Sequence, residues 1–130
     1  MVGDSDVINK VLAKSKFSEK KRLLVQHATE VVDADELPTH ALRNKKDSSM
    51  RVAINLLKEG RASACVSAGN TGALMATAKF VLKTIPGIDR PALLARLPGE
   101  SGSISRLLDV GASIGSSVNQ LVQFSIMGHI

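Results

Sequence analysis

The sequence predicts an α/β protein with a three-layer α/β/α architecture, in which helices cover both faces of a doubly wound, mostly parallel sheet. Strand-like and helix-like segments alternate along the 130 residues, and small-residue turns follow two of the strand-like segments. Hydrophobic residues make up 44% of the chain but aromatic residues only 2%, so the apolar content is aliphatic, as in buried parallel strands. Such alternation favours right-handed crossovers, with ligands at the carboxyl ends of the strands.

The first half of the chain contains two expected strands and two expected helices. Residues 1–4 resemble the end of a strand, and a helix is expected from Asp6 to Lys14, with its apolar residues on one side. A strand over 22–27 is followed by an acidic, Pro-containing stretch and a short segment that ends at Arg43. A helix is expected over 48–59, because its apolar residues have helical spacing and Gly60 stops the run.

The second half is expected to continue the alternation. Its expected elements are a strand over 64–66, a helix over 73–83, strands over 91–97 and 107–110, and a helix from about Val118. In this interpretation the chain begins partway through a fold, with the end of a strand. Its last expected helix carries apolar residues up to the last residues of the chain. We therefore expect residues 1–130 to form a single partial α/β domain, the central part of a longer protein.

Composition excludes several classes of function. The basic residues behind the net charge of +5 are scattered, and the chain has only three Phe and no Trp or Tyr for base stacking, so an anionic substrate or carrier is favoured over nucleic acid. Cys65 is the only cysteine, which excludes an intramolecular disulfide and favours a reducing, cytoplasmic location and an inert core thiol. No secretory signal, membrane span or metal-ligand spacing is visible.

The loop Ser67-Ala68-Gly69-Asn70-Thr71-Gly72-Ala73 is the first candidate binding site. It joins an expected strand to an expected helix, and its glycines allow the backbone to turn tightly and approach a ligand. Side chains of Ser67, Asn70 and Thr71 lie beside the free N–H groups of a helix start, which suits phosphate. The alternative is a plain strand-to-helix connection with an Asn or Thr N-cap. The loop lacks the P-loop and dinucleotide patterns, so a nucleotide is not implied.

Lys45 and Lys46 precede a second helix start, where Asp47 or Ser48 is a suitable N-cap. By itself this segment is explained by a solvated lysine pair before a capped helix. If both helices start on one sheet edge, however, Lys46 and the 67–71 loop converge on one anion. Asp109 stands at an expected strand end before Gly111. It either orients a substrate group, acts as a base or accepts hydrogen bonds from the amides of the next loop. His27 is more typical of a structural histidine.

Four motifs in register resemble the PlsX family, the bacterial phosphate acyltransferases of phospholipid synthesis. They are Lys45-Lys46-Asp47-Ser48-Ser49-Met50, Val66-Ser67-Ala68-Gly69-Asn70-Thr71-Gly72-Ala73-Leu74-Met75, Pro86-Gly87-Ile88-Asp89-Arg90-Pro91 and Leu108-Asp109-Val110-Gly111-Ala112. The resemblance covers nearly the whole chain and implies a fold related to isocitrate and isopropylmalate dehydrogenases and to phosphotransacetylases. It departs from the family pattern at Ser113 and Gly115, where the family usually has Asn and Asp.

The resemblance implies transfer of a fatty acyl group from acyl carrier protein to inorganic phosphate, giving acyl phosphate for phosphatidic acid synthesis. It implies a homodimer without cofactor or metal, with peripheral membrane association beside the glycerol-3-phosphate acyltransferase. The expected catalytic residues are Lys46, Asn70 and Asp109. The expected substrate- and phosphate-binding residues are Lys45, Ser48, Ser49, Ser67, Gly69, Thr71, Gly72 and Gly111.

Two other functions remain open from the sequence. One is a phosphotransacetylase-like enzyme that takes acyl groups from coenzyme A. A decarboxylating dehydrogenase of the same fold is less favoured, because the chain lacks a nucleotide-binding fingerprint. The other is an inert partial domain that binds anions without turnover. In either case the family's usual segments before and after these residues are not part of this chain, so activity of the 130 residues alone is not implied.

Overall fold

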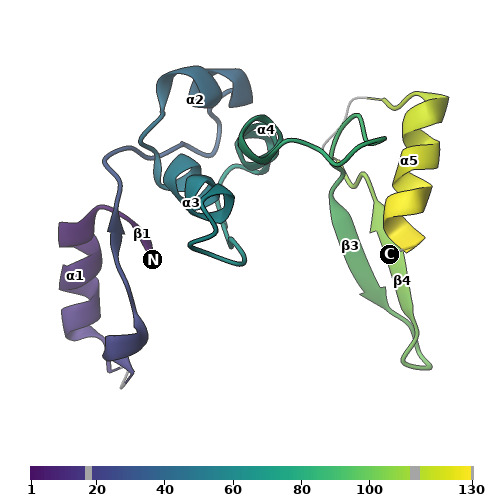
Figure 1. The fold of residues 1–130 in the computed structure, drawn as a ribbon. Coiled ribbons are helices and arrows are strands. Elements are labelled where there is room, and N and C mark those ends of the chain that lie inside the picture. Colours follow the sequence, from purple (N-terminus) through teal and green to yellow (C-terminus); the bar gives the residue numbers. More distant parts are fainter. Residues whose placement is uncertain (17–18, 112–114, 130) are drawn as a thin grey trace. The chain divides into compact units, whose positions relative to one another are not determined.

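A computed structural model describes residues 1–16, 19–111 and 115–129 (Figure 1). The chain divides into two compact units, Met1–Leu82 and Lys83–Ile130, and each is described by itself. The predicted α/β class is confirmed: helices occur together with one parallel and one antiparallel pair of strands. No helix in the described ranges is long and apolar enough to cross a membrane.

The first unit begins with a strand, a helix and a second strand. Strand β1 (Val2–Gly3) pairs in parallel with β2 (Gln26–His27), with Val2 opposite Gln26. Helix α1 (Ser5–Lys14) lies between them in sequence, and the 3-10 helix η1 (Lys20–Arg22) precedes β2. Asp4 caps α1 by accepting hydrogen bonds from the amides of Asp6 and Val7. The expected first strand and helix are confirmed, whereas only the end of the expected second strand forms a ladder.

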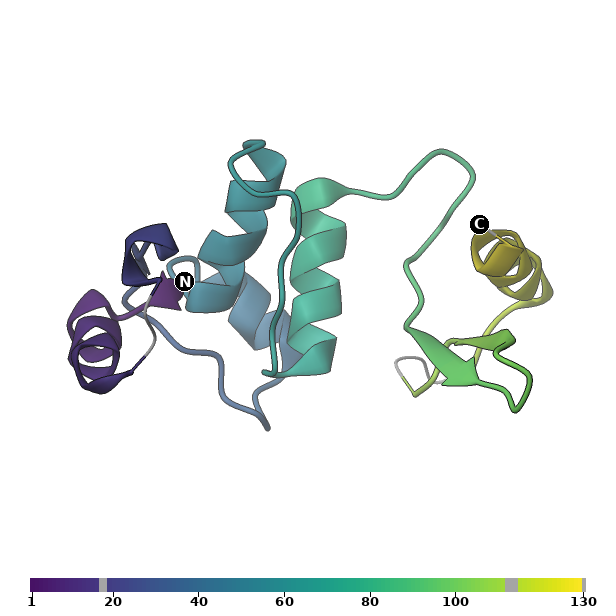
Figure 2. The same ribbon diagram turned by 90° about the horizontal axis from the view of Figure 1, so that it is seen from below.

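Three helices form the core of the first unit. Helices α2 (Pro38–Asn44) and α3 (Ser49–Lys58) both contact α4 (Thr71–Leu82), and Figures 1 and 2 show α3 and α4 side by side. The buried core cluster consists of Ala41, Met50, Ile54, Ala73 and Val81. Ile54 is only 1% exposed, so the packing of α3 and α4 fixes where the loop between them runs.

The strand expected over 64–66 does not form. The chain from Ser63 to Ala68 belongs to no strand or helix, and its main chain makes no hydrogen bond to any other main-chain group in the described part. A strand is defined by a ladder with a neighbour, and no neighbouring strand lies along this segment. The helix that follows it begins at Thr71, two residues earlier than expected.

The second unit is a hairpin with a helix. Strands β3 (Leu94–Pro98) and β4 (Ile104–Leu108) are antiparallel, and helix α5 (Val118–His129) packs on β4. The expectation of two more parallel strands is therefore wrong for this pair. A parallel connection needs a crossover of a dozen or more residues, whereas only the turn 99–103 joins these strands. Gly99 N–H donates to Ser103 O at 2.8 Å across that turn.

Candidate anion-binding site

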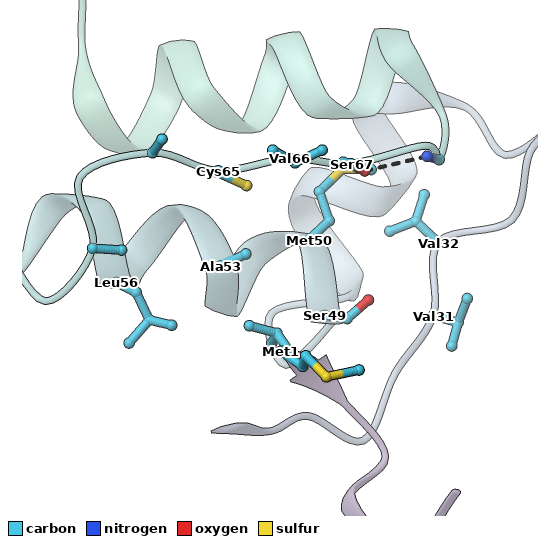
Figure 3. A pocket seen from close by; sticks show the side chains of 14 residues that line it. Met1, Val31, Val32, Ser49, Met50, Ala53, Leu56, Cys65, Val66 and Ser67 are labelled. Atoms are coloured by element: carbon cyan, nitrogen blue, oxygen red, sulfur yellow. Dashed lines mark hydrogen bonds between the residues drawn. The ribbon is translucent and has the colours of Figure 1, made fainter. Parts of the chain in front are cut away.

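The loop before α4 is organised by Asn70, which is the N-cap of this helix. Its Oδ1 accepts from the amide of Ala73 at 2.9 Å, and its main-chain oxygen accepts from the amide of Leu74 at 3.0 Å. Upstream, the Ser67 hydroxyl accepts from the amide of Gly69 at 3.2 Å (Figure 3). These local bonds follow from the sequence, because Ser and Asn are the side chains that turn a chain into a helix start.

The amide nitrogen of Asn70 fixes a second loop. Its Nδ2 lies 3.2 Å from the main-chain oxygen of Asp33, 3.1 Å from that of Ala34 and 2.9 Å from that of Glu36. An amide group has only two N–H donors, so these three oxygens share them. Asn70 thus joins the start of α4 to the 33–36 turn, because its Oδ1 and Nδ2 atoms are both hydrogen-bonded to main-chain groups of the protein.

Lys45 binds the same turn from the other side. Its Nζ lies 2.6 Å from Glu36 Oε2, 3.3 Å from Asp33 Oδ2 and 2.6 Å from the main-chain oxygen of Val31. Glu36 Oε1 also lies 2.6 Å from Nδ1 of His40, in the first turn of α2. The hydrogen bond from Lys45, followed by that from His40, lowers the pKa of Glu36 to about 2. The bond to Glu36 in turn raises the pKa of Lys45.

The start of α3 is held by Asp47 and Ser48. Ser48, only 2% exposed, accepts from the amide of Arg51 at 3.3 Å and donates to the main-chain oxygen of Lys45 at 2.9 Å. The Asp47 carboxylate accepts from both the hydroxyl and the amide of Thr29, and these bonds lower the pKa of Asp47. The amide of Ser49 donates to Glu30 O at 3.0 Å, so most polar groups at this helix start are already paired.

Four polar groups at these helix starts remain available. The amides of Thr71 and Gly72, in the first turn of α4, make no hydrogen bond within the described ranges. The side chains of Ser49 and the exposed Lys46 likewise have no hydrogen-bond or ion-pair partner in the part of the chain that the structure describes. Two free amides at a helix N-terminus favour an anion.

A pocket of about 480 Å³ brings the start of α3 to the loop before α4. Ser49 lines it together with Ser67 and Gly69, and Figure 3 shows Ser49 and Ser67 on opposite sides of it. The pocket thus brings together three of the residues expected to bind substrate, whereas the expected convergence of Lys46 with the 67–71 loop on one anion stays a prediction. Lys46 and Thr71 are not among the residues that line this pocket. Lys45 and Asn70 meet instead at the 33–36 turn.

The remaining predicted residues, Asp109 and Gly111, lie in the second unit. Asp109 Oδ2 accepts from the Ser116 hydroxyl at 2.8 Å and lies 3.9 Å from Arg90 Nη2. Arg90 also donates to the Ser116 hydroxyl and to Gly115 O at 3.1 Å. Asp109 has a φ of +61°, and the amide of Gly111 donates to its main-chain oxygen at 2.9 Å. The departure at Ser113 lies outside the described residues.

Sequence reasoning missed Glu36, Arg90 and Ser116. Glu36 stands four residues before His40, but it lies before the first residue of α2, so the helical spacing rule did not point to this pair. Arg90 lies inside one of the quoted motifs without having been given a role. His27 has the structural role that was favoured for it, since its Nδ1 accepts from the amide of Ser5 at 3.1 Å and so helps to cap α1.

No group of His, Cys, Asp and Glu that is suited to a metal ion occurs among the described residues. At the two helix starts, the groups without a partner among the described residues are the amides of Thr71 and Gly72, the Ser49 hydroxyl and the Lys46 side chain, a set of donors within an α/β fold that suits an anion. The chain matches the fatty acid synthesis protein family over residues 1–130 and belongs to it.

Curated relatives support the same family. This chain is 59% identical over 128 residues to the phosphate acyltransferase of Legionella pneumophila (strain Corby), 60% over 128 residues to that of Chromobacterium violaceum and 55% over 129 residues to that of Methylococcus capsulatus. These matches cover 98–99% of this chain but only 37–38% of each relative. The chain thus spans little more than a third of their length. The resemblance to the phosphate acyltransferases is confirmed.

Proposed function

We propose that these residues belong to a phosphate acyltransferase that moves a fatty acyl group from acyl carrier protein to inorganic phosphate. The observation that supports this most directly is the unpaired pair of amides at Thr71 and Gly72, at a helix start fixed by Asn70. Relatives named phosphate acyltransferase share more than half of the residues of this chain. The net charge of +5 suits an acidic carrier protein as the acyl donor.

The proposed reaction needs positioning more than covalent chemistry. A phosphate oxygen attacks the thioester carbonyl carbon, a C–O bond forms, the C–S bond breaks, and the carrier thiolate leaves and takes up a proton. Amides of Thr71 and Gly72 hold the phosphate, and Lys46 offsets its charge. Donors at this helix start also stabilise negative charge that develops in the transition state. Asn70 acts as a positioning residue through the cap, and Ser49 and Ser67 are proposed substrate contacts.

Two further parts of the proposal concern the whole protein. We propose the doubly wound parallel fold for the full length of the enzyme, together with a cytoplasmic, homodimeric state at the membrane surface. Lys45 and Ser48 support the site by holding the 33–36 turn and the start of α3. The roles of Asp109 and Gly111 in the same reaction remain predictions.

The test uses a chimera in which this chain replaces the 128 aligned residues of the Legionella pneumophila phosphate acyltransferase. Acyl phosphate formed from acyl carrier protein and phosphate is trapped with hydroxylamine as a hydroxamate. Lys46→Ala is expected to lower kcat/KM at least about tenfold, mainly by raising KM for phosphate. The control Lys58→Ala changes an exposed lysine at the other end of α3 and is expected to be neutral.

The possible outcomes distinguish the proposed reaction from its two alternatives and test the role of Lys46. Preference for acyl-coenzyme A over acyl carrier protein would replace the proposed donor and favour a phosphotransacetylase-like enzyme. A chimera that phosphate protects from unfolding, but that forms no hydroxamate from either donor, would support the anion-binding domain without turnover. Equal kinetics for Lys46→Ala and Lys58→Ala would remove Lys46 from the site.

A further inference from the structure

In the second unit, the connection that leads from β4 to α5 begins at Asp109 (Figure 1). This residue has a φ of +61°, in the left-handed region that side chains other than glycine rarely adopt. Its amide extends the β3–β4 ladder by donating to Leu93 O at 2.8 Å, and its main-chain oxygen accepts from the amide of Gly111 at 2.9 Å. Strain of this kind persists only where the surroundings hold the residue, and it clusters at functional sites. The groups that hold Asp109 therefore bear on its function.

Two side chains hold the Asp109 carboxylate. The Ser116 hydroxyl donates to Asp109 Oδ2 at 2.8 Å, and Arg90 Nη2 donates to the same hydroxyl at 3.3 Å. Because a guanidinium only donates and a hydroxyl has one proton, the bonds run in one direction, from Arg90 through Ser116 to Asp109. Arg90 Nη2 also lies 3.9 Å from Asp109 Oδ2, and the two side chains are only 28% and 16% exposed, so water screens their charges less than at the surface.

Arg90 is held in turn by its own main chain and by the loop before α5. Its Nη2 donates to Gly115 O at 3.1 Å. The amide of the preceding residue, Asp89, donates to Gln123 Oε1 at 2.9 Å, and Gln123 Nε2 donates to Asp89 Oδ2 at 2.8 Å. Gln123 lies in α5 and is only 6% exposed, so these two bonds fasten the segment before β3 to the buried side of the helix. Residues 89 and 90 thus fix both α5 and the loop that precedes it.

One donor of Arg90 is left unpaired by this arrangement. Its Nε is buried and has no hydrogen-bond partner among the described residues. An unpaired buried donor destabilises a fold, and in native proteins it calls for a specific explanation. A position that served stability alone would pair this donor or expose it to water. The arginine is therefore placed for the bonds that its Nη2 makes, which lead to Ser116 and Asp109.

We propose that Arg90 is a positioning residue for acyl transfer, which acts through Ser116 to hold the Asp109 carboxylate in one orientation as a hydrogen-bond acceptor. The proposal rests on the proposed function, because it takes Asp109 to act in that reaction. Three roles were open for Asp109 from the sequence, and a carboxylate held by a hydroxyl and a guanidinium favours the orientation of a substrate group. A small rotation of a group that orients a substrate lowers the rate steeply, so the residues that hold it affect turnover.

The first test compares arginine variants in the chimera defined above, with the hydroxamate assay. Arg90→Ala is expected to lower kcat at least about tenfold with little change in KM for phosphate, because it misplaces a group without removing a phosphate contact. Arg90→Lys keeps the charge but not the fork that bonds Ser116 and Gly115, so it is expected to restore kcat only in part. Arg96→Ala changes an exposed arginine of β3 and is the matched control, expected to be neutral.

A double variant tests whether Arg90 acts through Asp109. If it does, Arg90→Ala combined with Asp109→Ala is expected to be no slower than Asp109→Ala alone, since the second change removes the group that the first one misplaces. Effects on kcat that multiply would overturn the proposal. Ser116→Ala removes a single oxygen, and we expect it to lower kcat at least about threefold, which keeps the test available for an Arg90→Ala protein that does not fold.

Chemical rescue separates positioning from a purely structural role. Free guanidinium ion at millimolar concentration is expected to raise kcat of Arg90→Ala at least about threefold, because it restores the donors to Ser116, whereas methylammonium is expected not to. Variants that unfold at a lower temperature but keep the kcat of the parent chimera would overturn the proposal. An active chimera in which Arg90→Ala matches Arg96→Ala would refute the positioning role alone. A chimera that forms no hydroxamate from either acyl donor would refute the proposed function and the positioning role with it.

Discussion

The side-chain amide of Asn70 donates to the main-chain oxygen of Glu36 at 2.9 Å, while the Glu36 carboxylate lies 2.6 Å from Lys45 Nζ. Asn70, expected to be catalytic, and Lys45, expected to bind substrate or phosphate, thus meet through a third residue that the sequence did not single out. The side chains of Glu36 and Lys45 are 10% and 21% exposed, so the pair is half-buried. The relationship indicates that Asn70 and Lys45 shape the anion site by fixing the loops around it.

Asn70→Ala is expected to destabilise the chain. It removes the α4 cap and the donors to the 33–36 turn, and a lost cap or hydrogen bond costs about 1 kcal/mol each. We expect a loss of roughly 1–3 kcal/mol in the free energy of unfolding, measured by urea titration. Asn9→Ala, at an exposed position of α1, is the control and is expected to be neutral. An unchanged urea midpoint for Asn70→Ala would show that the turn is held by Lys45 alone.

The lowered pKa of Glu36 predicts a pH dependence of stability. Because this carboxyl has a pKa of about 2 when folded and an ordinary pKa of 4.5 when unfolded, the unfolded chain takes up its proton first as the pH falls. The stabilisation is present above about pH 4.5 and is lost as the pH falls towards 2. Glu36→Gln is expected to flatten this part of the profile in urea unfolding between pH 2 and 5. Parallel profiles for the two proteins would exclude Glu36 as the source.

Ser48 and Ser49 are expected to separate stability from function. Ser48→Ala removes a buried N-cap and is expected to cost about 1 kcal/mol in the free energy of unfolding. Ser49→Ala removes a hydroxyl without a partner in the described structure and is expected to leave stability unchanged. Thermal unfolding of both variants, followed by the hydroxamate assay in the chimera, checks this. A larger stability loss for Ser49→Ala than for Ser48→Ala would reverse the assignment.

Gly72→Ala tests how closely α4 approaches α2. A Cβ at Gly72 stands 2.9 Å from Pro38 Cγ, whereas one at Gly69 stands 3.5 Å from Met50 Cε and 3.5 Å from Ser67 Oγ. Alanine favours a helix by about 1 kcal/mol over glycine, but overpacking against a ring costs about 1–3 kcal/mol. We expect a net loss for Gly72→Ala and a smaller effect for Gly69→Ala in urea unfolding. A stabilised Gly72→Ala variant would show that the Pro38 ring shifts freely.

The helices were the best predicted part of the fold because their signals are local. The apolar spacing over 6–14, the expected cap at Asp47 or Ser48 and the stop at Gly60 placed α1 and α3 within a residue or two of their observed bounds. Strand pairing was predicted less well, because a ladder depends on a neighbour distant in sequence. Residues 64–66 have strand composition but no ladder partner within the described ranges, and β3 and β4 are joined by a short turn that makes them antiparallel.

The sequence by itself determined the family, the α/β class, the helix starts and the loop from Ser67 to Ala73, because each depends on residue type and spacing along the chain. The tertiary structure decided which polar groups are hydrogen-bonded within the described part of the chain and which are not. It pairs Lys45 and Asn70 with the 33–36 turn and forms the pocket that Ser49, Ser67 and Gly69 line, while Lys46 and the amides of Thr71 and Gly72 have no partner among the described residues. Those outcomes depend on contacts between residues far apart in sequence, which a local pattern does not encode.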